Sequence, residues 1–181
     1  MSDLDTMGDR GPSDPLLIFE TLTRHGVDFV AIGGWALISH GSTRNTRDVD
    51  FVAAADNANL ARLEAALKEL DAQLWGVDAH LLGIDLDART LAEGGNFTLA
   101  EGGNFTLVTR AGGLDFFNEV PGGAPYEEVR ARSIVADLGD GLQIRIAGIH
   151  DLIAMKRAAG RPQDVRDIAT LTHIERERRS G

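Results

Sequence analysis

The sequence predicts an α/β (α+β) fold in which a mixed β-sheet is flanked by helices and a C-terminal helical pair closes the domain. Short apolar runs bounded by glycine, such as residues 29–32, are typical of buried strands. Residues 57–70 place leucine and alanine on one helix face, which predicts an amphipathic helix. Because each kind of element must bury its apolar side, we expect the helices to pack against the sheet.

The elements follow in order from an N-terminal arm. Residues 1–13 are rich in Gly, Ser and Asp and predict a flexible arm, and residues 14–181 predict a single domain. Asp14 as N-cap and Pro15 at the first helical position predict a helix that ends near Gly26. The other predicted helices are 35–39, 57–70, about 149–159 and 163–178, and the predicted strands are 29–32, 49–52, 81–86, 104–109, 114–120, 134–138 and 142–147.

An octapeptide, LAEGGNFT, occurs at residues 91–98 and again without change at 99–106. A period of eight found only twice is too short for a repeat architecture, so the pattern indicates a local duplication. Surface loops tolerate insertions, because the entropy of loop closure grows slowly with length. We therefore expect one copy to pair in the sheet and the other to bulge into a loop.

Composition excludes several classes of protein. The 28 acidic and 18 basic side chains give a net charge of -10, which argues against a protein that coats nucleic acid nonspecifically. The chain has no cysteine, so disulfides, thiolate catalysis and cysteine-bound zinc are excluded. A polar N-terminus without an apolar segment, and no apolar run near the roughly 20 residues of a membrane helix, lead us to expect a cytoplasmic protein with no membrane partner.

Two short motifs carry the chemistry. Asp48 and Asp50 flank Val49, and on a strand residues two apart point to the same face. Two neighbouring carboxylates repel each other unless a cation lies between them, and Mg²⁺ prefers oxygen ligands. Gly33 and Gly34 follow a predicted strand and precede a helix, where glycine lets the backbone approach a phosphate. Taken separately, each motif also fits a structural role, as an acidic strand edge or a plain turn.

Together these motifs form a known pattern. The segment IGGWALISHGSTRNTRDVDF resembles the signature of the nucleotidyltransferase superfamily, with 13 residues, 35–47, between Gly34 and Asp48. Within the superfamily, residues 27–171 look most like small bacterial proteins related to minimal nucleotidyltransferases and to abortive-infection toxins. The resemblance implies a nucleotidyltransferase-like mixed sheet and a third carboxylate on a neighbouring strand.

Asp115, set in the apolar run 114–117, is the best candidate for that third carboxylate, because an acid buried in a strand needs a partner or a metal. Glu119 lies nearer the end of the same strand and is the fallback. Asp85 and Asp87, on another predicted strand, rank below Asp115.

The resemblance also implies basic residues that bind phosphate. Arg44 and Arg47 flank the loop before Asp48 and could contact a triphosphate or pair with the acids. The segment 151–167 resembles a helix pair of the toxin-like relatives in which the lysine, here Lys156, points toward the nucleotide phosphates. Asp164 and Asp167 are expected to cap and brace those helices.

The predicted activity is metal-dependent transfer of a nucleoside monophosphate from an NTP to an acceptor that the sequence does not identify. The acceptor could be an RNA such as tRNA, a protein or a small molecule, and the chain could be the toxin of a toxin–antitoxin pair with a cognate antitoxin. Mg²⁺ or Mn²⁺ is the expected cofactor. The alternative is a catalytically inactive nucleotide-binding or protein-interaction module on the same fold. The predicted metal-binding and catalytic residues are Asp48, Asp50 and Asp115, and the predicted nucleotide-binding residues are Gly33, Gly34, Arg44, Arg47 and Lys156.

Overall fold

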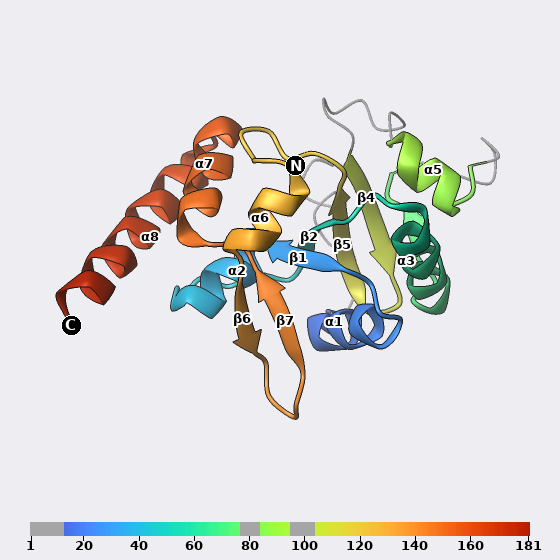
Figure 1. Ribbon diagram of the computed structural model, residues 1–181, viewed down its shortest axis with the longest axis horizontal. Coiled ribbons are helices and arrows are strands. Elements are labelled where there is room, and N and C mark those ends of the chain that lie inside the picture. The colour runs from blue at the N-terminus through green and yellow to red at the C-terminus, as the bar shows by residue number, and fades with distance from the viewer. Residues whose placement is uncertain (1–12, 77–83, 95–103) are drawn as a thin grey trace, which may run out of the picture.

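A computed structural model describes residues 13–76, 84–94 and 104–181, and it confirms the α/β fold. Seven strands of the described chain form one mixed sheet in the order β3-β4-β5-β2-β1-β7-β6. Figure 1 labels these strands except β3. The strands are β1 (Phe29–Ile32), β2 (Val49–Ala53), β3 (Gln73–Leu74), β4 (Asn104–Thr109), β5 (Gly112–Phe117), β6 (Ile134–Asp137) and β7 (Gln143–Ile146).

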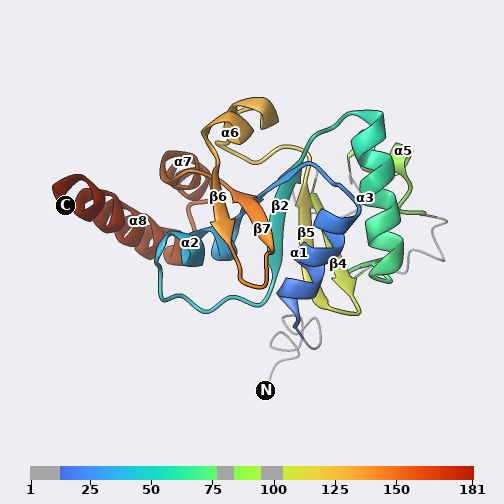
Figure 2. The same ribbon diagram turned by 60° about the horizontal axis from the view of Figure 1, so that its bottom comes forward.

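Helices surround this sheet. They are α1 (Pro15–Arg24), α2 (Gly33–His40), α3 (Asn57–Glu69), α5 (Ala88–Glu93), α6 (Tyr126–Arg132), α7 (Ile149–Ala159) and α8 (Pro162–Ser180). The C-terminal pair α7 and α8 lies at one end of the molecule and α3 with α5 at the other (Figure 1). The hairpin of β6 and β7 runs alongside α1 in the turned view (Figure 2). No helix in the three described stretches is long and apolar enough to cross a lipid bilayer.

The pairing at the centre of the sheet decides where the acids lie. β2 runs antiparallel to β1, with Ile32 opposite Asp50. On its other side β2 runs parallel to β5, with Asp50 opposite Asp115. β4 then pairs with β5 in an antiparallel hairpin, in which Thr106 lies opposite Asp115. Two predicted site residues from distant parts of the chain thus become direct neighbours.

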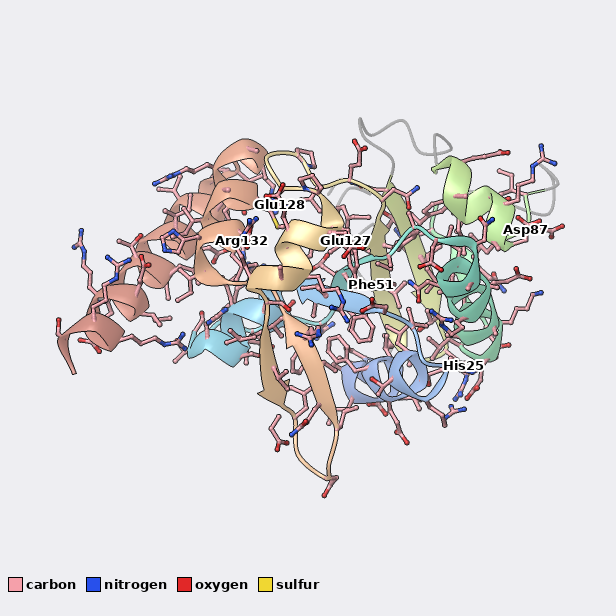
Figure 3. The ribbon with its side chains drawn as sticks, in the orientation of Figure 1. His25, Phe51, Asp87, Glu127, Glu128 and Arg132 are labelled. Atoms are coloured by element: carbon pink, nitrogen blue, oxygen red, sulfur yellow. The ribbon has the colours of Figure 1, made fainter. Side chains whose placement is uncertain are left out.

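A row of aromatic rings fixes which sheet face is apolar. Phe29, Phe51, Phe116 and Phe105 come from four adjacent strands, and successive ring centroids lie 5.8, 5.4 and 5.7 Å apart. All four are buried, and Figure 3 shows Phe51 among the side chains between β1 and α1. Because strand residues alternate between faces, the positions between these rings, including Asp50, point to the opposite face.

The end of α8 is attached to α2 through a buried histidine. Nε2–H of His40 donates to the Ala147 carbonyl at 2.8 Å. Arg178 approaches Nδ1 of the same ring at 3.3 Å and donates to the His40 carbonyl at 3.0 Å. Burial lowers the pKa of His40, and the charge of Arg178 lowers it further. The ring is therefore held neutral, with Nδ1 as acceptor.

The predicted strand 81–86 is wrong in its described part. Residues 84–86 have no regular structure, and residues 81–83 lie outside the described chain. Asp87 instead begins α5 as its N-cap, and its carboxylate accepts from the Thr90 amide at 2.8 Å. An aspartate three residues before a donor amide favours a helix start over an extended strand. Asp87 therefore has a structural role, and Asp85 is not on a strand.

Smaller differences concern element ends. β5 begins at Gly112 and ends at Phe117, so Glu119 lies beyond the strand and is exposed. α2 begins at Gly33 rather than at Trp35, and the two glycines therefore form its first turn. The sequence analysis did not predict β3, which has two residues, or α6, which follows Pro125.

The two copies of the octapeptide have different fates. The first copy begins as the last turn of α5, where Leu91 is buried. The second copy ends as the first residues of β4, from Asn104 onward. Residues 95–103 between them lie outside the described chain, as do residues 1–12 of the predicted arm. The second copy thus pairs in the sheet, as expected.

Candidate active site

A cavity of about 420 Å³ opens on the polar face of the sheet, between the strand ends and α7. Its lining residues come from the end of β1, the start of α2, the loop before β2, the strands β2, β4 and β5, the loop after β5, α7 and the junction of α7 with α8. They are Ile32, Gly33, Gly34, Arg44, Thr46, Asp48, Asp50, Asn104, Asp115, Phe117, Val120, Pro121, Leu152, Met155, Lys156, Ala159 and Arg161. This volume is within the range of small-molecule sites.

Three carboxylates line the cavity. Asp48 precedes β2, Asp50 lies two residues later on the same face, and Asp115 is opposite Asp50 on the neighbouring strand. All three are partly exposed. Among the described residues no group of three or more His, Cys, Asp or Glu side chains converges closely enough to hold a metal ion. The three acids therefore share the cavity lining without forming a complete metal cage by themselves.

The two glycines are required by close packing. A Cβ on Gly33 would lie 2.7 Å from Cγ and 2.9 Å from Cβ of Asp50, and Gly33 has a φ of +61°. A Cβ on Gly34 would lie 2.5 Å from Oγ1 of Thr46. The first turn of α2 thus rests directly on Asp50 and on the loop before β2. Glycine at both positions brings the helix N-terminus, with its free N–H groups, against the acids.

A buried ion-pair network lies where α7 meets α8. Nζ of Lys156 is 2.9 Å from Oδ1 of Asp164 and 2.8 Å from Oδ2 of Asp167. Nη1 of Arg44 is 2.6 Å from Asp167, and Nε of Arg161 is 2.8 Å from Asp164. The side chain of Asp164 is only 1% exposed. The expected bracing role of the two aspartates is confirmed, and Lys156 is paired by both of them.

This network contains more cations than carboxylates, and its buried aspartate Asp164 is ionised. Burial alone would raise the pKa of Asp164, but hydrogen bonds from Arg161 and Lys156 outweigh burial and hold that pKa well below its usual range. Asp164 is therefore ionised, and its hydrogen bond raises the pKa of Arg161. Three cations, Arg44, Lys156 and Arg161, face two aspartates, and all three cations line the cavity. The network therefore has one more cation than aspartates, which favours an anion at its end of the cavity, whereas Asp48, Asp50 and Asp115 make the other part of the lining acidic.

Part of the cavity lining is apolar. Phe117 is the last residue of β5, Val120 and Pro121 follow it, and Leu152 and Met155 belong to α7. The loop after Pro121 is pressed against α7, because a Cβ on Gly122 would lie 2.5 Å from Cβ of Ala158. Charged and apolar surfaces thus meet around the three acids.

Two solved structures share this arrangement of elements. The solution structure of the antibiotic-resistance factor ANT(2'')-Ia matches with a TM-score of 0.53 and 14% identity, over 92% of this chain and 89% of that chain. A crystal structure of ANT(2'')-Ia in complex with adenylyl-2''-tobramycin matches with a TM-score of 0.54 and 14% identity, over 92% and 93%. ANT(2'')-Ia is an aminoglycoside nucleotidyltransferase.

The fold is nucleotidyltransferase-like. No protein-family model and no curated protein sequence matches the chain, and at 14% identity the two structures show the fold alone. The nucleotidyltransferase resemblance seen in the signature segment is thus supported at the level of the fold. The narrower resemblance to minimal nucleotidyltransferases and abortive-infection toxins stays a prediction.

Most of the predicted site residues meet in the cavity of this nucleotidyltransferase-like fold. They are Gly33, Gly34, Arg44, Asp48, Asp50, Asp115 and Lys156. Arg47 is exposed and does not line the cavity, and its carbonyl accepts a hydrogen bond from Ser13 at 2.7 Å.

Sequence reasoning did not assign Arg161, Thr46 or Asn104 to the site. Thirteen residues separate the signature glycines from the acids, and nothing in that loop marks Thr46. Arg161 directly precedes Pro162 at the start of a helix, so its sequence position indicates the helix end rather than a ligand contact. Asn104 begins an ordinary alternating strand.

Proposed function

We propose that this chain is a nucleotidyltransferase that moves a nucleoside monophosphate from an NTP to a hydroxyl group of a small-molecule acceptor. One observation carries the proposal. Asp50 and Asp115 are opposite each other on adjacent strands, and with Asp48 they line a single cavity whose rim holds the first turn of α2 and three cations. This is the set of groups that phosphoryl chemistry needs, because catalysis there is mostly positioning and charge stabilisation.

A divalent cation fits the donor set. Asp48, Asp50 and Asp115 are hard oxygen donors on one cavity wall, and Mg²⁺ or Mn²⁺ takes one or two carboxylates together with substrate phosphates. Because the described acids do not form a complete metal cage, we expect substrate phosphate oxygens to complete the coordination of the ion. When bound, such an ion supplies charge neutralisation at the phosphates and lowers the pKa of the acceptor hydroxyl.

The triphosphate would lie against α2 and the cationic rim. Backbone N–H groups of Gly33 and Gly34, at a helix N-terminus, would donate to phosphate oxygens. Lys156, Arg44 and Arg161 would supply positive charge, and Asp164 and Asp167 would hold those side chains in place. Any phosphate role of Arg47 requires its exposed side chain to turn toward the cavity.

Asp115 would act on the acceptor. Its carboxylate would take the proton of the acceptor hydroxyl while that oxygen bonds to the α-phosphorus and the bond to the leaving pyrophosphate breaks. Asp115 suits this role because it lies on the side of Asp50 that faces away from β1 and the glycines. The products would be a nucleotidylated acceptor and pyrophosphate.

The charge of the chain favours a cationic or neutral small acceptor. A net charge of -10 opposes docking of a polyanion, whereas it attracts cations. The adenylyl-2''-tobramycin held by ANT(2'')-Ia is such a compound attached to a nucleotide. A tRNA or protein acceptor, and a toxin role with a cognate antitoxin, stay predictions. Growth arrest on expression that disappears in an Asp48→Ala, Asp50→Ala variant would favour the toxin role, and benign expression would count against it.

Calorimetric titration tests the proposal. ATP, CTP, GTP and UTP are each titrated with and without Mg²⁺ into the native chain and into an Asp48→Asn, Asp50→Asn variant. These substitutions keep the shape of both side chains and remove their charge. Metal-dependent binding of at least one NTP that is lost in the variant is expected. NTP binding that ignores both the metal and the substitutions would favour the inactive module instead.

A further inference from the structure

Asn104, the first residue of β4, lies at the far end of the row of site residues. Asn104 is opposite Phe117 of β5, two positions along from the pair of Thr106 and Asp115, so its side chain shares the polar face with Asp115. It lines the same cavity as the acids. Neither the sequence signature nor the proposed chemistry gives it a role.

The side-chain oxygen of Asn104 is buried and has no hydrogen-bond partner within residues 13–76, 84–94 and 104–181. Asn59, by contrast, is a buried amide with hydrogen-bond partners for both atoms. Its oxygen accepts from Asp28 N at 2.7 Å, and its nitrogen donates to two carbonyls. A buried polar atom without a partner destabilises the fold by about 1–3 kcal/mol unless a ligand or water satisfies it.

Other described residues also carry such an atom, but none of them belongs to the cavity lining. They are Trp35, Arg62 and Tyr126. Asn104 is thus singled out by two independent observations, its place in the cavity and its unsatisfied oxygen. Asn104 lines the cavity, and a turn of its side-chain amide would present the unsatisfied oxygen to a hydroxyl or ammonium donor of a ligand there.

The order of the strands indicates whether Asn104 is on the pyrophosphate side or on the acceptor side of the cavity. Across the sheet the sequence of positions is Asn104 on β4, Asp115 on β5, Asp50 on β2 and Gly33 after β1. In phosphoryl transfer the attacking and leaving oxygens lie roughly in line on opposite sides of the phosphorus. If pyrophosphate leaves beside Gly33, the nucleophile enters from the side of Asp115 and Asn104.

We propose that Asn104 binds the acceptor and helps to determine its specificity, by accepting a hydrogen bond from an ammonium or hydroxyl group next to the reacting hydroxyl. The inference rests on the proposed function and adds the acceptor side of the site to it. The acceptor class that fits is a small polyhydroxylated amine, because Asp115 is on the strand next to Asn104 and Asp48 and Asp50 line the same cavity. Asn104 contributes binding and orientation, and it takes no proton.

Calorimetry with tobramycin as probe tests this inference, in the presence of Mg²⁺ and a non-hydrolysable ATP analogue. Asn104→Leu keeps the branching at Cγ and removes the oxygen, whereas Asn104→Asp keeps the oxygen and adds charge. Asn57→Leu is the matched control, because Asn57 is exposed at the start of α3, away from the cavity. Circular dichroism of each variant verifies folding.

Asn104→Leu is expected to weaken tobramycin binding by about tenfold or more, the loss of one hydrogen bond to a charged group. The affinity of Asn104→Leu for the ATP analogue should change by less than about twofold. Asn104→Asp should bind tobramycin at least as tightly as the native chain. Asn57→Leu should bind both ligands as the native chain does. Equal losses for tobramycin and the analogue, or a loss in Asn104→Asp as large as in Asn104→Leu, would overturn the inference. A native chain that binds the analogue but not tobramycin overturns the acceptor assignment and leaves the proposed function standing, whereas a native chain that binds neither overturns both.

Discussion

Replacing Gly33 with alanine, and comparing the result with the same change at Gly26, distinguishes the effect of close packing at the site from the effect of backbone strain. The added Cβ would lie 2.7 Å from Cγ and 2.9 Å from Cβ of Asp50, well inside van der Waals contact. The Cβ of Asp50 is attached to β2 and cannot move away by side-chain rotation, so α2 and the strand must separate. Gly26 provides a matched control, since its φ of +70° is similar to the +61° of Gly33 and its new Cβ would meet only Arg62, at 3.6 Å.

The two variants should differ in magnitude. An alanine in the left-handed region costs roughly 1–2 kcal/mol, so Gly26→Ala should lower the free energy of unfolding by about that amount and leave activity intact. Gly33→Ala adds a forced shift of the helix N-terminus, for which overpacking costs typically about 1–3 kcal/mol more. Because a displacement of about 1 Å at reacting groups can cost about 100-fold in rate, nucleotidyl transfer should fall by at least that factor.

Urea unfolding followed by circular dichroism measures the stability of both variants, and the initial rate of pyrophosphate release measures activity. If Gly33→Ala behaves like Gly26→Ala in both assays, the close approach of α2 to Asp50 does not matter for the site and the geometric argument fails.

Three further predictions concern the ion pairs, the histidine and the duplication. Lys156→Met leaves the buried Asp164 and Asp167 with one cation fewer, so urea unfolding should show a loss of about 3–5 kcal/mol, and a loss below about 1 kcal/mol would contradict a tight buried network. Burial depresses the pKa of His40 below 6.5, so its contribution to stability is present above pH 6.5 and is lost as the pH falls through the folded pKa; His40→Gln should flatten that part of the stability–pH curve, and an unchanged curve would refute this account. Deleting residues 99–106 leaves one LAEGGNFT whose first three residues would end α5 and whose last three would begin β4, so the free energy of unfolding measured with heat or urea should change by less than about 1 kcal/mol, whereas failure to fold would show that both copies are needed.

Patterns with a local physical cause could be predicted from the sequence. Asp14 caps α1 by accepting from the Leu17 amide at 3.1 Å, as its position before Pro15 indicated. The apolar run of β1 and the leucines of α3 gave elements within a residue or two of those observed. Asp48 and Asp50 could be chosen as a carboxylate pair within the signature, and Asp115 could be chosen because a carboxylate inside an apolar strand needs a partner or a metal.

Features set by tertiary contacts could not be predicted in this way. The sequence indicated that Gly33 and Gly34 approach a phosphate, but it could not indicate that they pack on Asp50 and Thr46. The pairing of Lys156 with both aspartates depends on how α7 meets α8. Residues 84–86 alternate like a strand, yet the cap at Asp87 directs the chain into α5.

The place of Asn104 in the cavity also depends on tertiary contacts and could not be predicted from the sequence. Its sequence context is an unremarkable strand within a repeated octapeptide, and only the pairing of β4 with β5 brings it beside Asp115. Asn104 becomes a candidate site residue only in the structure, where it lines the cavity and its buried oxygen has no hydrogen-bond partner among the described residues.

The central claim, that the cavity transfers a nucleoside monophosphate, is tested most directly by following the label of two NTP preparations. One carries ³²P at the α-position and the other at the γ-position, and each is incubated with Mg²⁺, the native chain or Asp115→Asn, and tobramycin, a small-molecule extract, RNA or protein in turn. The account predicts that the α-label appears on an acceptor while the γ-label leaves as pyrophosphate, and that Asp115→Asn abolishes both. Transfer of the γ-label to the acceptor, or no transfer of either label to any acceptor by a chain that binds the NTP, would contradict it.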